Sequence, residues 1–151
     1  MKGICFETID SKFNAHGGNE PTLPSRATSG AMAYDFFSSE DAFIPPNGRK
    51  MIWTDIKAHM TENVGLVLNV RSSMGKYGVR LVNTQGWIDC DYYDNPTNGG
   101  NIGICLANDG EAPYVIHQGD RIAQGMFIPY LTVENDDTYG ERTGGFGSTG
   151  R

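Results

Sequence analysis

Two acidic residues, two positions apart, are the first candidates for chemistry in this sequence. Asp89 and Asp91 stand in residues 86–93, which read GWIDCDYY. If this segment is a strand, residues two apart face the same side, so both carboxylates can hold a metal or orient a water molecule. Charged residues solvated at a sheet edge explain the same pair equally well.

The C-terminal tail holds a second set of candidate residues. Arg142 precedes the run GGFGSTG, which contains Phe146, Ser148 and Thr149. A guanidinium binds phosphate oxygens in bidentate fashion, a glycine backbone can approach phosphates closely, and an aromatic ring can stack on a base. The set suits a nucleotide, although a flexible Gly/Ser tail is an equally good interpretation of the composition alone.

A third candidate is the segment RSSMG at residues 71–75, which follows the apolar run VGLVLNV. A strand there would deliver Arg71 and the hydroxyls of Ser72 and Ser73 into a turn, as a phosphate cradle requires. Taken alone, the segment is better explained as an ordinary turn in which a serine hydroxyl bonds its own backbone.

Two further polar residues stand among apolar neighbours. Asp35 lies in AYDFF and Gln124 lies in GDRIAQGMF. A carboxylate in such surroundings needs an arginine partner or a metal, and an amide needs a hydrogen-bond partner. A structural hydrogen bond is the simple interpretation of both.

The histidines and cysteines are spread widely along the chain: His16, His59, His117, Cys5, Cys90 and Cys105. Their spacing fits neither a zinc site nor a disulfide framework, which favours structural or surface histidines and a reducing cytoplasm. The sequence contains neither a Walker A motif nor GxGxxG, so the common nucleotide-binding folds are excluded.

The apolar pattern predicts that strands position these residues. Apolar residues recur with period two, or in short runs, in residues 51–60, 64–70, 77–83, 101–107, 114–118 and 126–133. Turn residues separate these segments at intervals of roughly 8 to 12 residues, which indicates an all-β sandwich or barrel, and no helical pattern of useful length occurs. Residues 14–30 and 94–101 are expected to be loops, and the tail from residue 134 either stays disordered or folds over a ligand.

Composition narrows the function classes. A chain of 151 residues fits one domain, and its formal charge of −6 argues against direct binding to nucleic-acid backbones. A free nucleotide remains possible, because a few local arginines and a metal can hold a triphosphate. No apolar stretch approaches the roughly 18 residues of a membrane span, so we expect no membrane association.

Taken together and in order, AYDFF, RSSMG, NTQGWIDCDYY, GDRIAQ and RTGGFGSTG resemble the five motifs of the trimeric dUTPase family, and they cover residues 33–150. The resemblance implies an all-β jelly-roll (β-clip) subunit over residues 1–133 in a homotrimer. Residues 134–151 would form a flexible C-terminal arm that closes over an active site assembled from all three subunits. The implied activity is hydrolysis of dUTP to dUMP and pyrophosphate with Mg²⁺ as cofactor, in the cytoplasm of a bacterial cell or a phage-infected host. Its role would be to limit uracil in DNA and to supply dUMP for thymidylate synthesis.

The same resemblance implies roles for individual residues around the nucleoside. Asp89 would be the catalytic residue that orients and activates the attacking water. Asn83, with the hairpin backbone at Gly86 and Ile88, would read uracil, and Tyr92 would pack under the deoxyribose and reject a 2′-hydroxyl. Strict alternation would place Asp89 and Tyr92 on opposite faces, so a turn or bulge is expected within this hairpin.

The remaining residues would bind the phosphates and close the site. Arg71, Ser72 and Gln124 would hold the phosphate chain. Asp35 would belong, through water, to the network around the metal, whose other ligands are the substrate phosphates. The other substrate-binding positions implied by the second and fifth motifs are Ser73, Gly75, Arg142, Phe146, Gly147, Ser148 and Thr149. Among these, Arg142, Ser148 and Thr149 would meet the γ-phosphate, and Phe146 would cover the uracil.

Three departures from the family pattern stand out. Ala33 and Ser73 occupy positions that usually carry glycine. Asp94 and the following NPTNGGN replace the usual short Arg-Gly connection after the third-motif tyrosine, as in a subset of bacterial and phage members.

Two other functions fit parts of the pattern. A dCTP deaminase shares the fold and the trimer but needs a catalytic set around a glutamate, and the IDCDY and GGFGSTG segments favour dUTP hydrolysis. A nucleotide-dependent interaction protein would use residues 14–30 and 94–101 to contact a regulatory protein partner.

Overall fold

The computed structural model describes residues 2–145, and the predicted all-β class is confirmed. The strands are β1 (Cys5–Thr8), β2 (Tyr34–Phe37), β3 (Ala42–Ile44), β4 (Arg49–Trp53), β5 (Ile56–His59), β6 (Val64–Asn69), β7 (Val79–Leu81), β8 (Gly86–Ile88), β9 (Gly103–Asn108), β10 (Tyr114–Ile116) and β11 (Arg121–Pro129). The helical elements within the described range are short: η1 (Ser11–Phe13), α1 (Ser72–Lys76) and η2 (Cys90–Tyr92).

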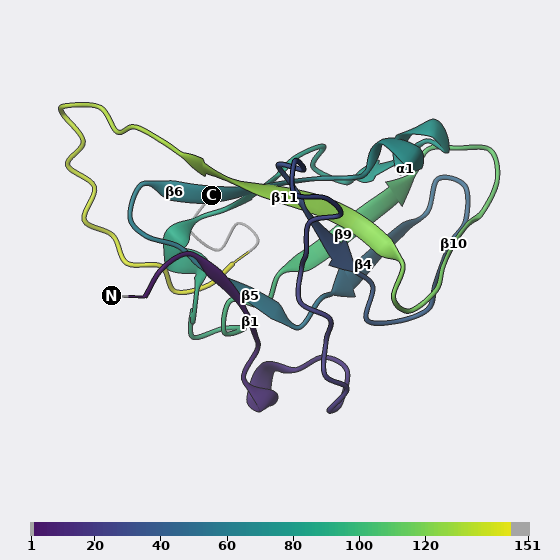
Figure 1. Cartoon of the computed structure of the whole chain (residues 1–151), viewed down its shortest axis with the longest axis horizontal. Coiled ribbons are helices and arrows are strands. Elements are labelled where there is room, and N and C mark those ends of the chain that lie inside the picture. Colours follow the sequence, from purple (N-terminus) through teal and green to yellow (C-terminus); the bar gives the residue numbers. More distant parts are fainter. Residues whose placement is uncertain (1, 146–151) are drawn as a thin grey trace.

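The strands pair in antiparallel fashion in four small sheets. The largest has the order β2-β11-β6-β8, and the second has the order β4-β9-β7. The pairs β1-β5 and β10-β3 complete the body. In Figure 1, β11 and β6 run together along the long axis, and the chain beyond β11 loops outward and returns to the body.

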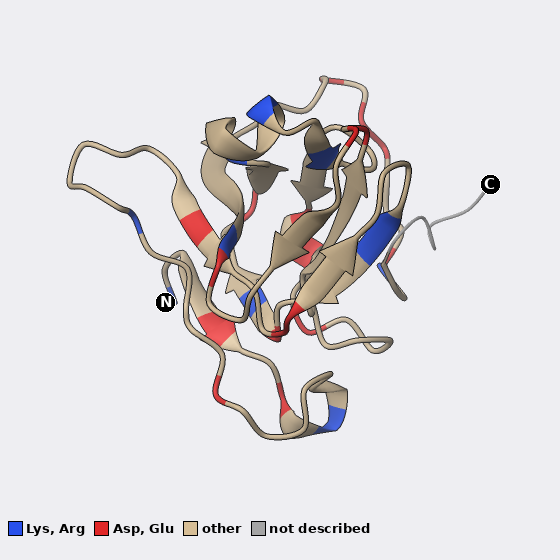
Figure 2. Cartoon of the chain, turned by 90° about the vertical axis from the view of Figure 1, so that its right-hand side faces the viewer, with Lys and Arg blue, Asp and Glu red and all other residues tan. Residues whose placement is uncertain are grey.

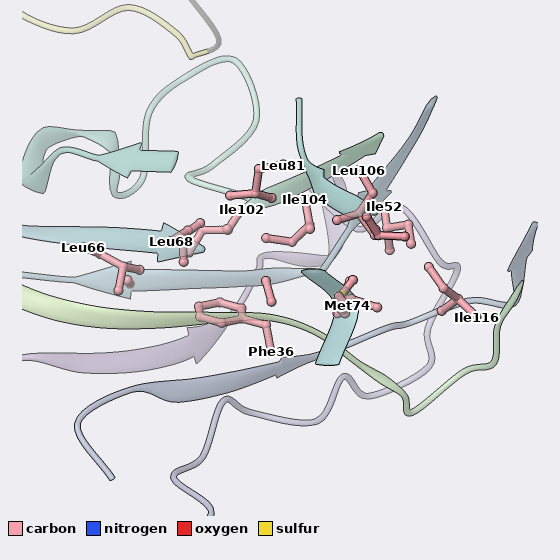
Figure 3. Close-up of a cluster of buried hydrophobic side chains, with 14 of the residues drawn as sticks. Phe36, Ile52, Leu66, Leu68, Met74, Leu81, Ile102, Ile104, Leu106 and Ile116 are labelled. Carbon is pink, nitrogen blue, oxygen red and sulfur yellow. The ribbon is translucent and has the colours of Figure 1, made fainter. Parts of the chain in front are cut away.

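A single apolar core holds the two main sheets together. It includes Phe36 of β2, Leu66 and Leu68 of β6, and Ile104 and Leu106 of β9, all almost completely buried. Figure 3 shows these side chains gathered between strands that lie far apart in the sequence. Leu66 and Leu68 on one face of β6 and Val67 on the other are all buried. Because both faces are buried, the sequence of β6 is a continuous apolar run rather than an alternation.

The structure corrects two of the strand boundaries expected from the sequence. Residues 51–60 do not form one strand, because Asp55 has φ 56° and interrupts the extended chain between β4 and β5. The strand expected over residues 126–133 begins earlier, at Arg121, and ends at Pro129. From residue 130 to 145 the chain forms neither helix nor strand.

Residues 14–30 form an irregular segment, as expected, and His16 fastens it to the sheets. The Nδ1 atom of His16 lies 2.6 Å from Oδ2 of Asp55, and its Nε2 atom lies 2.9 Å from Oε2 of Glu40. Asp55 is fully buried, and its other carboxylate oxygen accepts a hydrogen bond from the Ala15 amide at 2.9 Å. The structural role expected for His16 is therefore confirmed.

This arrangement makes the stability of the protein depend on pH. Burial of His16 by itself lowers its pKa, because it disfavours the charged imidazolium. The hydrogen bonds to Glu40 and Asp55 have a larger combined effect in the opposite direction, so the pKa of His16 is raised above 6.5. A raised pKa in the folded state contributes stability that is complete below the unfolded pKa and is lost as the pH rises through the folded pKa. We therefore expect the free energy of unfolding in urea to fall as the pH rises above about 6.5, and this slope should be absent in His16→Gln.

A control separates this effect from general histidine titration. His117 is exposed, so His117→Gln should keep the slope of the unmodified protein. An unchanged slope in His16→Gln would show that the two ion pairs do not stabilise the fold.

Candidate functional site

The segment that carries Asp89 and Asp91 is a short strand followed by a turn. Strand β8 ends at Ile88, Asp89 precedes the 3₁₀ turn η2, and Asp91 lies within it. The interpretation that both carboxylates share one strand face is therefore wrong, because the strand ends before either of them. The turn expected between Asp89 and Tyr92 is confirmed, and it brings both residues to one cavity.

That cavity has a volume of about 430 Å³ and lies beside β8, between the two main sheets. Its apolar wall includes Leu68 and Ile104, which belong to the buried core. Its remaining wall contains residues predicted to hold the nucleoside, namely Asn83, Gly86, Ile88 and Tyr92. Asp89, predicted to activate water, and Arg142, predicted to meet the γ-phosphate, line the same cavity.

Close packing of backbones shapes the cavity floor. A methyl group added at Gly86 would lie 3.1 Å from Cβ of Leu68, and one added at Gly103 would lie 2.8 Å from Sδ of Met51. The glycines therefore let β8 and β9 approach their neighbours more closely than side chains would allow.

Tyr92 is held in place by its hydroxyl group. The side chain is buried, and the hydroxyl donates to the Asn101 carbonyl oxygen at 2.7 Å and accepts from Nδ2 of Asn98 at 2.8 Å. Burial raises the pKa of Tyr92, so the phenol stays protonated at neutral pH. The Tyr92 ring that lines the cavity is therefore uncharged and fixed in position.

Arg142 reaches the same cavity from the returning C-terminal segment. Its Nε atom donates to Oδ1 of Asp91 at 2.7 Å, and its Nη2 atom pairs with Asp89. The guanidinium is itself largely buried and also donates to the Gly144 carbonyl oxygen at 3.1 Å. The two acidic residues therefore converge on one arginine.

A second group of predicted residues surrounds Asp35 on β2. The Asp35 carboxylate is almost buried and lies 3.1 Å from Nε of Arg71 and 3.5 Å from Nε of Arg121. Arg71, Ser73 and Arg121 line a hollow of about 360 Å³. Asp35 thus has the arginine partners that its sequence context required.

The RSSMG segment is not the turn expected from the sequence. Arg71 precedes the five-residue helix α1, and residues 72–75 lie within it. In this helix Ser72 and Gly75 are exposed, whereas Met74 is buried in the core. Met74 packs against the core and so favours a helical turn here over the serine-bonded turn.

Gln124 lies in a row of polar residues that crosses the largest sheet. It stands opposite Asp35 of β2 on one side and opposite Asn69 of β6 on the other. Residues directly opposite one another share a face of the sheet. Nε2 of Gln85 donates to Oδ1 of Asn69 at 3.2 Å, which extends the row to the residue before β8.

Within one chain the predicted site is divided. The cavity at Tyr92 and the hollow at Arg71 have no lining residue in common. The sequence did not point to Asn69, Gln85 or Asn98, because their roles depend on strand register and loop conformation. Phe146, Gly147, Ser148 and Thr149 lie outside the described residues.

Positive charge at the cavity and the hollow comes from separate arginines, Arg142 in the first and Arg71 and Arg121 in the second, rather than from a continuous basic patch. Figure 2 shows Lys and Arg scattered among Asp and Glu over the described chain. Within residues 2–145, no group of three or more His, Cys, Asp and Glu side chains is arranged to hold a metal ion. No helix in the same range is long and apolar enough to cross a membrane.

The Asp35 ion pairs should contribute measurable stability. Asp35→Asn keeps the shape of the side chain but leaves Arg71 and Arg121 without a countercharge. Because both arginines are partly exposed, we expect a loss of about 1–2 kcal/mol in urea unfolding rather than the larger cost of a fully buried pair.

An exposed pair provides the matched control for this change. Arg80 and Asp109 form an ion pair whose partners are both well exposed, so Asp109→Asn should change stability by less than about 0.5 kcal/mol. Equal losses in the two variants would mean that Asp35 does not organise the two arginines.

Comparison with known proteins identifies relatives over nearly the whole chain. Residues 19–150 match the dUTPase family model. The deoxyuridine 5'-triphosphate nucleotidohydrolase of Lactococcus lactis subsp. lactis (strain IL1403) is 39% identical over 153 residues, covering 99% of each chain. That of Mannheimia succiniciproducens is 37% identical over 160 residues, covering 100% of this chain and 99% of the relative.

Solved structures show the same similarity. The dUTPase from Streptococcus mutans superposes with a TM-score of 0.76 and 33% identity, covering 89% of this chain and 100% of that one. A mutant dUTPase from phage phi11 of S. aureus, described with a structural Mg(II) ion, has a TM-score of 0.69 at 19% identity, covering 92% of this chain and 98% of that one. The second likeness concerns the fold alone.

Proposed function

Because this chain belongs to the dUTPase family, and is by that membership a dUTP-hydrolysing enzyme, we propose that water attacks the α-phosphorus of dUTP in line with the departing pyrophosphate, with Mg²⁺ bound to the triphosphate. The observation that carries this proposal is the cavity that brings Asn83, Asp89 and Tyr92 together. Alignment of the reactants and neutralisation of charge supply most of the rate enhancement in such a reaction.

The cavity at β8 accepts the deoxyuridine. Asn83 and the backbone at Gly86 and Ile88 read the uracil edge, since an amide and a strand backbone offer both donors and acceptors. The ring of Tyr92 packs under the deoxyribose. Because this ring is buried and hydrogen-bonded, it does not yield to a 2′-hydroxyl, and UTP is rejected.

Asp89 acts as the general base. It lies on the cavity wall just beyond β8, where its carboxylate can accept a proton from a water molecule directed at the α-phosphorus. Before substrate binds, Arg142 pairs with this carboxylate. The incoming triphosphate draws the guanidinium away and leaves Asp89 free to orient water.

The phosphate chain is held by the arginine-rich hollow around Asp35. Arg71 binds phosphate oxygens together with Ser72, Ser73, Gly75 and Gln124, and Asp35 keeps the two guanidinium groups in position. Since the nucleoside cavity and this hollow are separate within one chain, a complete site combines parts of neighbouring subunits.

A homotrimer provides this combination. Phe43 of β3 and Val115 of β10 stand opposite one another and are 61% and 53% exposed, and Trp87 beside the cavity is 67% exposed. Association would cover such apolar surface. A mass in solution three times that of one chain supports the shared site, and a monomeric mass in an active preparation contradicts it.

The oxygen atoms of Asp35 and of the substrate phosphates suit Mg²⁺ that is bound chiefly by the substrate. Both oxygens of Asp35 face arginines, so Asp35 would contribute to a bound Mg²⁺ through water rather than as a direct ligand. Mg²⁺ favours oxygen ligands and keeps several waters, and phosphate oxygens complete its shell. When bound, it neutralises charge that develops on the triphosphate.

The C-terminal arm, residues 134–151, closes the site. Arg142, with Ser148 and Thr149, meets the γ-phosphate, while Phe146 covers the uracil and Gly147 allows the backbone to approach. The contacts of Arg142 with Asp89 and Asp91 support this proposal, because Arg142 belongs to this arm and lines the cavity.

In the cell, this activity limits the incorporation of uracil into DNA and supplies dUMP for thymidylate synthesis. The three free cysteines agree with a reducing cytoplasm, in a bacterium or a phage-infected host. A regulatory protein partner that contacts residues 14–30 or 94–101 would give the same protein a second role.

The proposal is tested with a panel of nucleotides. Pyrophosphate release is measured from dUTP, UTP, dCTP and dTTP, with Mg²⁺ and with chelator, and ammonia release is measured from dCTP. We expect metal-dependent turnover of dUTP alone. Ammonia from dCTP would instead indicate a deaminase, and a folded protein inactive on all four nucleotides would favour the interaction protein.

A further inference from the structure

The loop at residues 94–101, where this chain departs from the usual family pattern, is held rigid by its own side chains. Oδ1 of Asn95 accepts hydrogen bonds from the amides of Thr97 and Asn98, each at 3.1 Å. Nδ2 of Asn95 donates to the Tyr92 carbonyl oxygen at 2.9 Å, and the whole side chain is buried. The loop therefore presents Thr97 and Asn98 in a defined conformation.

Both ends of this loop are anchored to β5 and the residue before it. Oδ1 of Asp94 lies 2.5 Å from Nζ of Lys57, whose side chain is only 7% exposed. Nδ2 of Asn101 donates to Oδ1 of Asp55 at 2.8 Å. Gly99 and Gly100 have φ values of 63° and 83°, which other residues rarely adopt, so the chain can reverse between the anchors.

The first contact from the loop to the site reaches Tyr92. Asn98 donates to its hydroxyl at 2.8 Å, and this hydroxyl donates its own proton to the Asn101 carbonyl oxygen at 2.7 Å. Since a phenol has a single proton, its donor capacity is used within the protein. Tyr92 therefore offers its ring to the cavity, while the loop holds its hydroxyl.

The second contact reaches the arm. Oγ1 of Thr97 donates to the Thr143 carbonyl oxygen at 2.8 Å, next to Arg142. Gly145 lies so close to the Tyr92 ring that any side chain at this position would collide with it. Thr143 of the arm thus contacts the loop, Gly145 contacts the Tyr92 ring, and the loop itself also contacts Tyr92.

We propose that residues 94–101 form a clamp that sets sugar specificity, in which Asn98 is a positioning residue for the Tyr92 ring and Thr97 is a positioning residue for the arm. The proposal rests on the function above and assigns to this loop a role in discriminating dUTP from UTP. Asn98 acts through Tyr92, so its loss relaxes the ring without removing a group that touches the substrate. Thr97 acts through the Thr143 backbone, so its loss affects closure rather than the sugar.

The test compares Asn98→Ala and Thr97→Val with the unmodified protein as intact oligomers. Asn98→Ala removes the bond to the Tyr92 hydroxyl and also the acceptor of Asn95 Nδ2 and of the Gly100 amide. It should lower the ratio of kcat/KM for dUTP to that for UTP by about tenfold or more, with kcat for dUTP changed less than about threefold. Thr97→Val should raise KM for dUTP about threefold to tenfold and leave the ratio unchanged. Asn19→Ala, at an exposed asparagine in residues 14–30, should alter neither.

A double variant distinguishes positioning from a general structural role. In a Tyr92→Phe background there is no hydroxyl to hold, so adding Asn98→Asp, which keeps the acceptor for Asn95 and Gly100, should not lower the ratio further. Should Asn98→Ala fail to fold, Asn98→Asp keeps the shape but removes the donor, and it should lower the ratio similarly. An unchanged ratio in a folded Asn98 variant, or a further fall in the double variant, overturns the proposal, as does an unchanged KM in Thr97→Val. Failure of the underlying function is recognised separately, because the unmodified protein would then not turn over dUTP.

Discussion

We expect Asp89→Asn to lower kcat for dUTP by about 10³-fold while leaving nucleotide affinity within a few-fold of the unmodified protein. Asparagine keeps the size and position of the side chain on the cavity wall but cannot take a proton from water. The readouts are pyrophosphate release for turnover and calorimetric titration with a non-hydrolysable dUTP analogue for binding.

Asp91→Asn is the matched control for this change. Asp91 lies two residues away and shares the Arg142 guanidinium with Asp89, but it does not line the nucleoside cavity. Its replacement should therefore reduce kcat by less than about tenfold. Near-normal turnover in Asp89→Asn, or equal losses in both variants, would remove Asp89 from the role of general base.

Arg142→Ala is expected to lower kcat/KM for dUTP by about 10² to 10³-fold, the usual cost of removing a group that stabilises charge in the transition state. The guanidinium is the positive group of the arm that already lies against Asp89 and Asp91. Arg142→Lys keeps the charge but not the planar pair of donors, so it should recover only part of the loss. Both constants come from initial rates of pyrophosphate release.

Arg26→Ala serves as the control for Arg142. Arg26 donates only to carbonyl oxygens of its own loop, at Ser29 and Ala31, among the hydrogen bonds of the described residues. Its replacement should leave kcat/KM unchanged. If Arg142→Ala were as active as Arg26→Ala, Arg142 would have no role in binding the γ-phosphate.

The family resemblance alone assigned Asn83 and Tyr92 to the nucleoside, and their convergence on one cavity follows from their closeness in the chain. Asn83, Asp89 and Tyr92 lie within ten positions of one another, so a single hairpin and its following turn determine their geometry. The error concerned the strand end. Alternation alone cannot reveal that β8 stops at Ile88, because the next residues are equally compatible with an extended chain.

The arrangement of the residues proposed to bind the phosphates was harder to predict, because it depends on long-range strand pairing. Asp35 meets Arg71 and Arg121 only because β2 pairs with β11 and β11 pairs with β6. A one-residue change of register would turn these side chains to the opposite face. Sequence context showed that Asp35 needs a partner but did not identify both arginines.

The loop at residues 94–101 shows the same limit at short range. Its Asn, Gly and Pro content predicts a loop but not a rigid one. The order comes from specific bonds of Asn95 and from the anchors at Asp55 and Lys57, which lie on a distant part of the chain. The substrate roles of all the site residues stay predictions, and Phe146 and the residues after it also lie outside the described residues.

The central claim, that water attacks the α-phosphorus of dUTP, is tested most directly by a single turnover in ¹⁸O-labelled water, followed by mass spectrometry of both products. Attack at the α-phosphorus places one ¹⁸O atom in dUMP and leaves the pyrophosphate unlabelled. Label in the pyrophosphate, with unlabelled dUMP, would place the attack at the β-phosphorus and contradict the role assigned to Asp89.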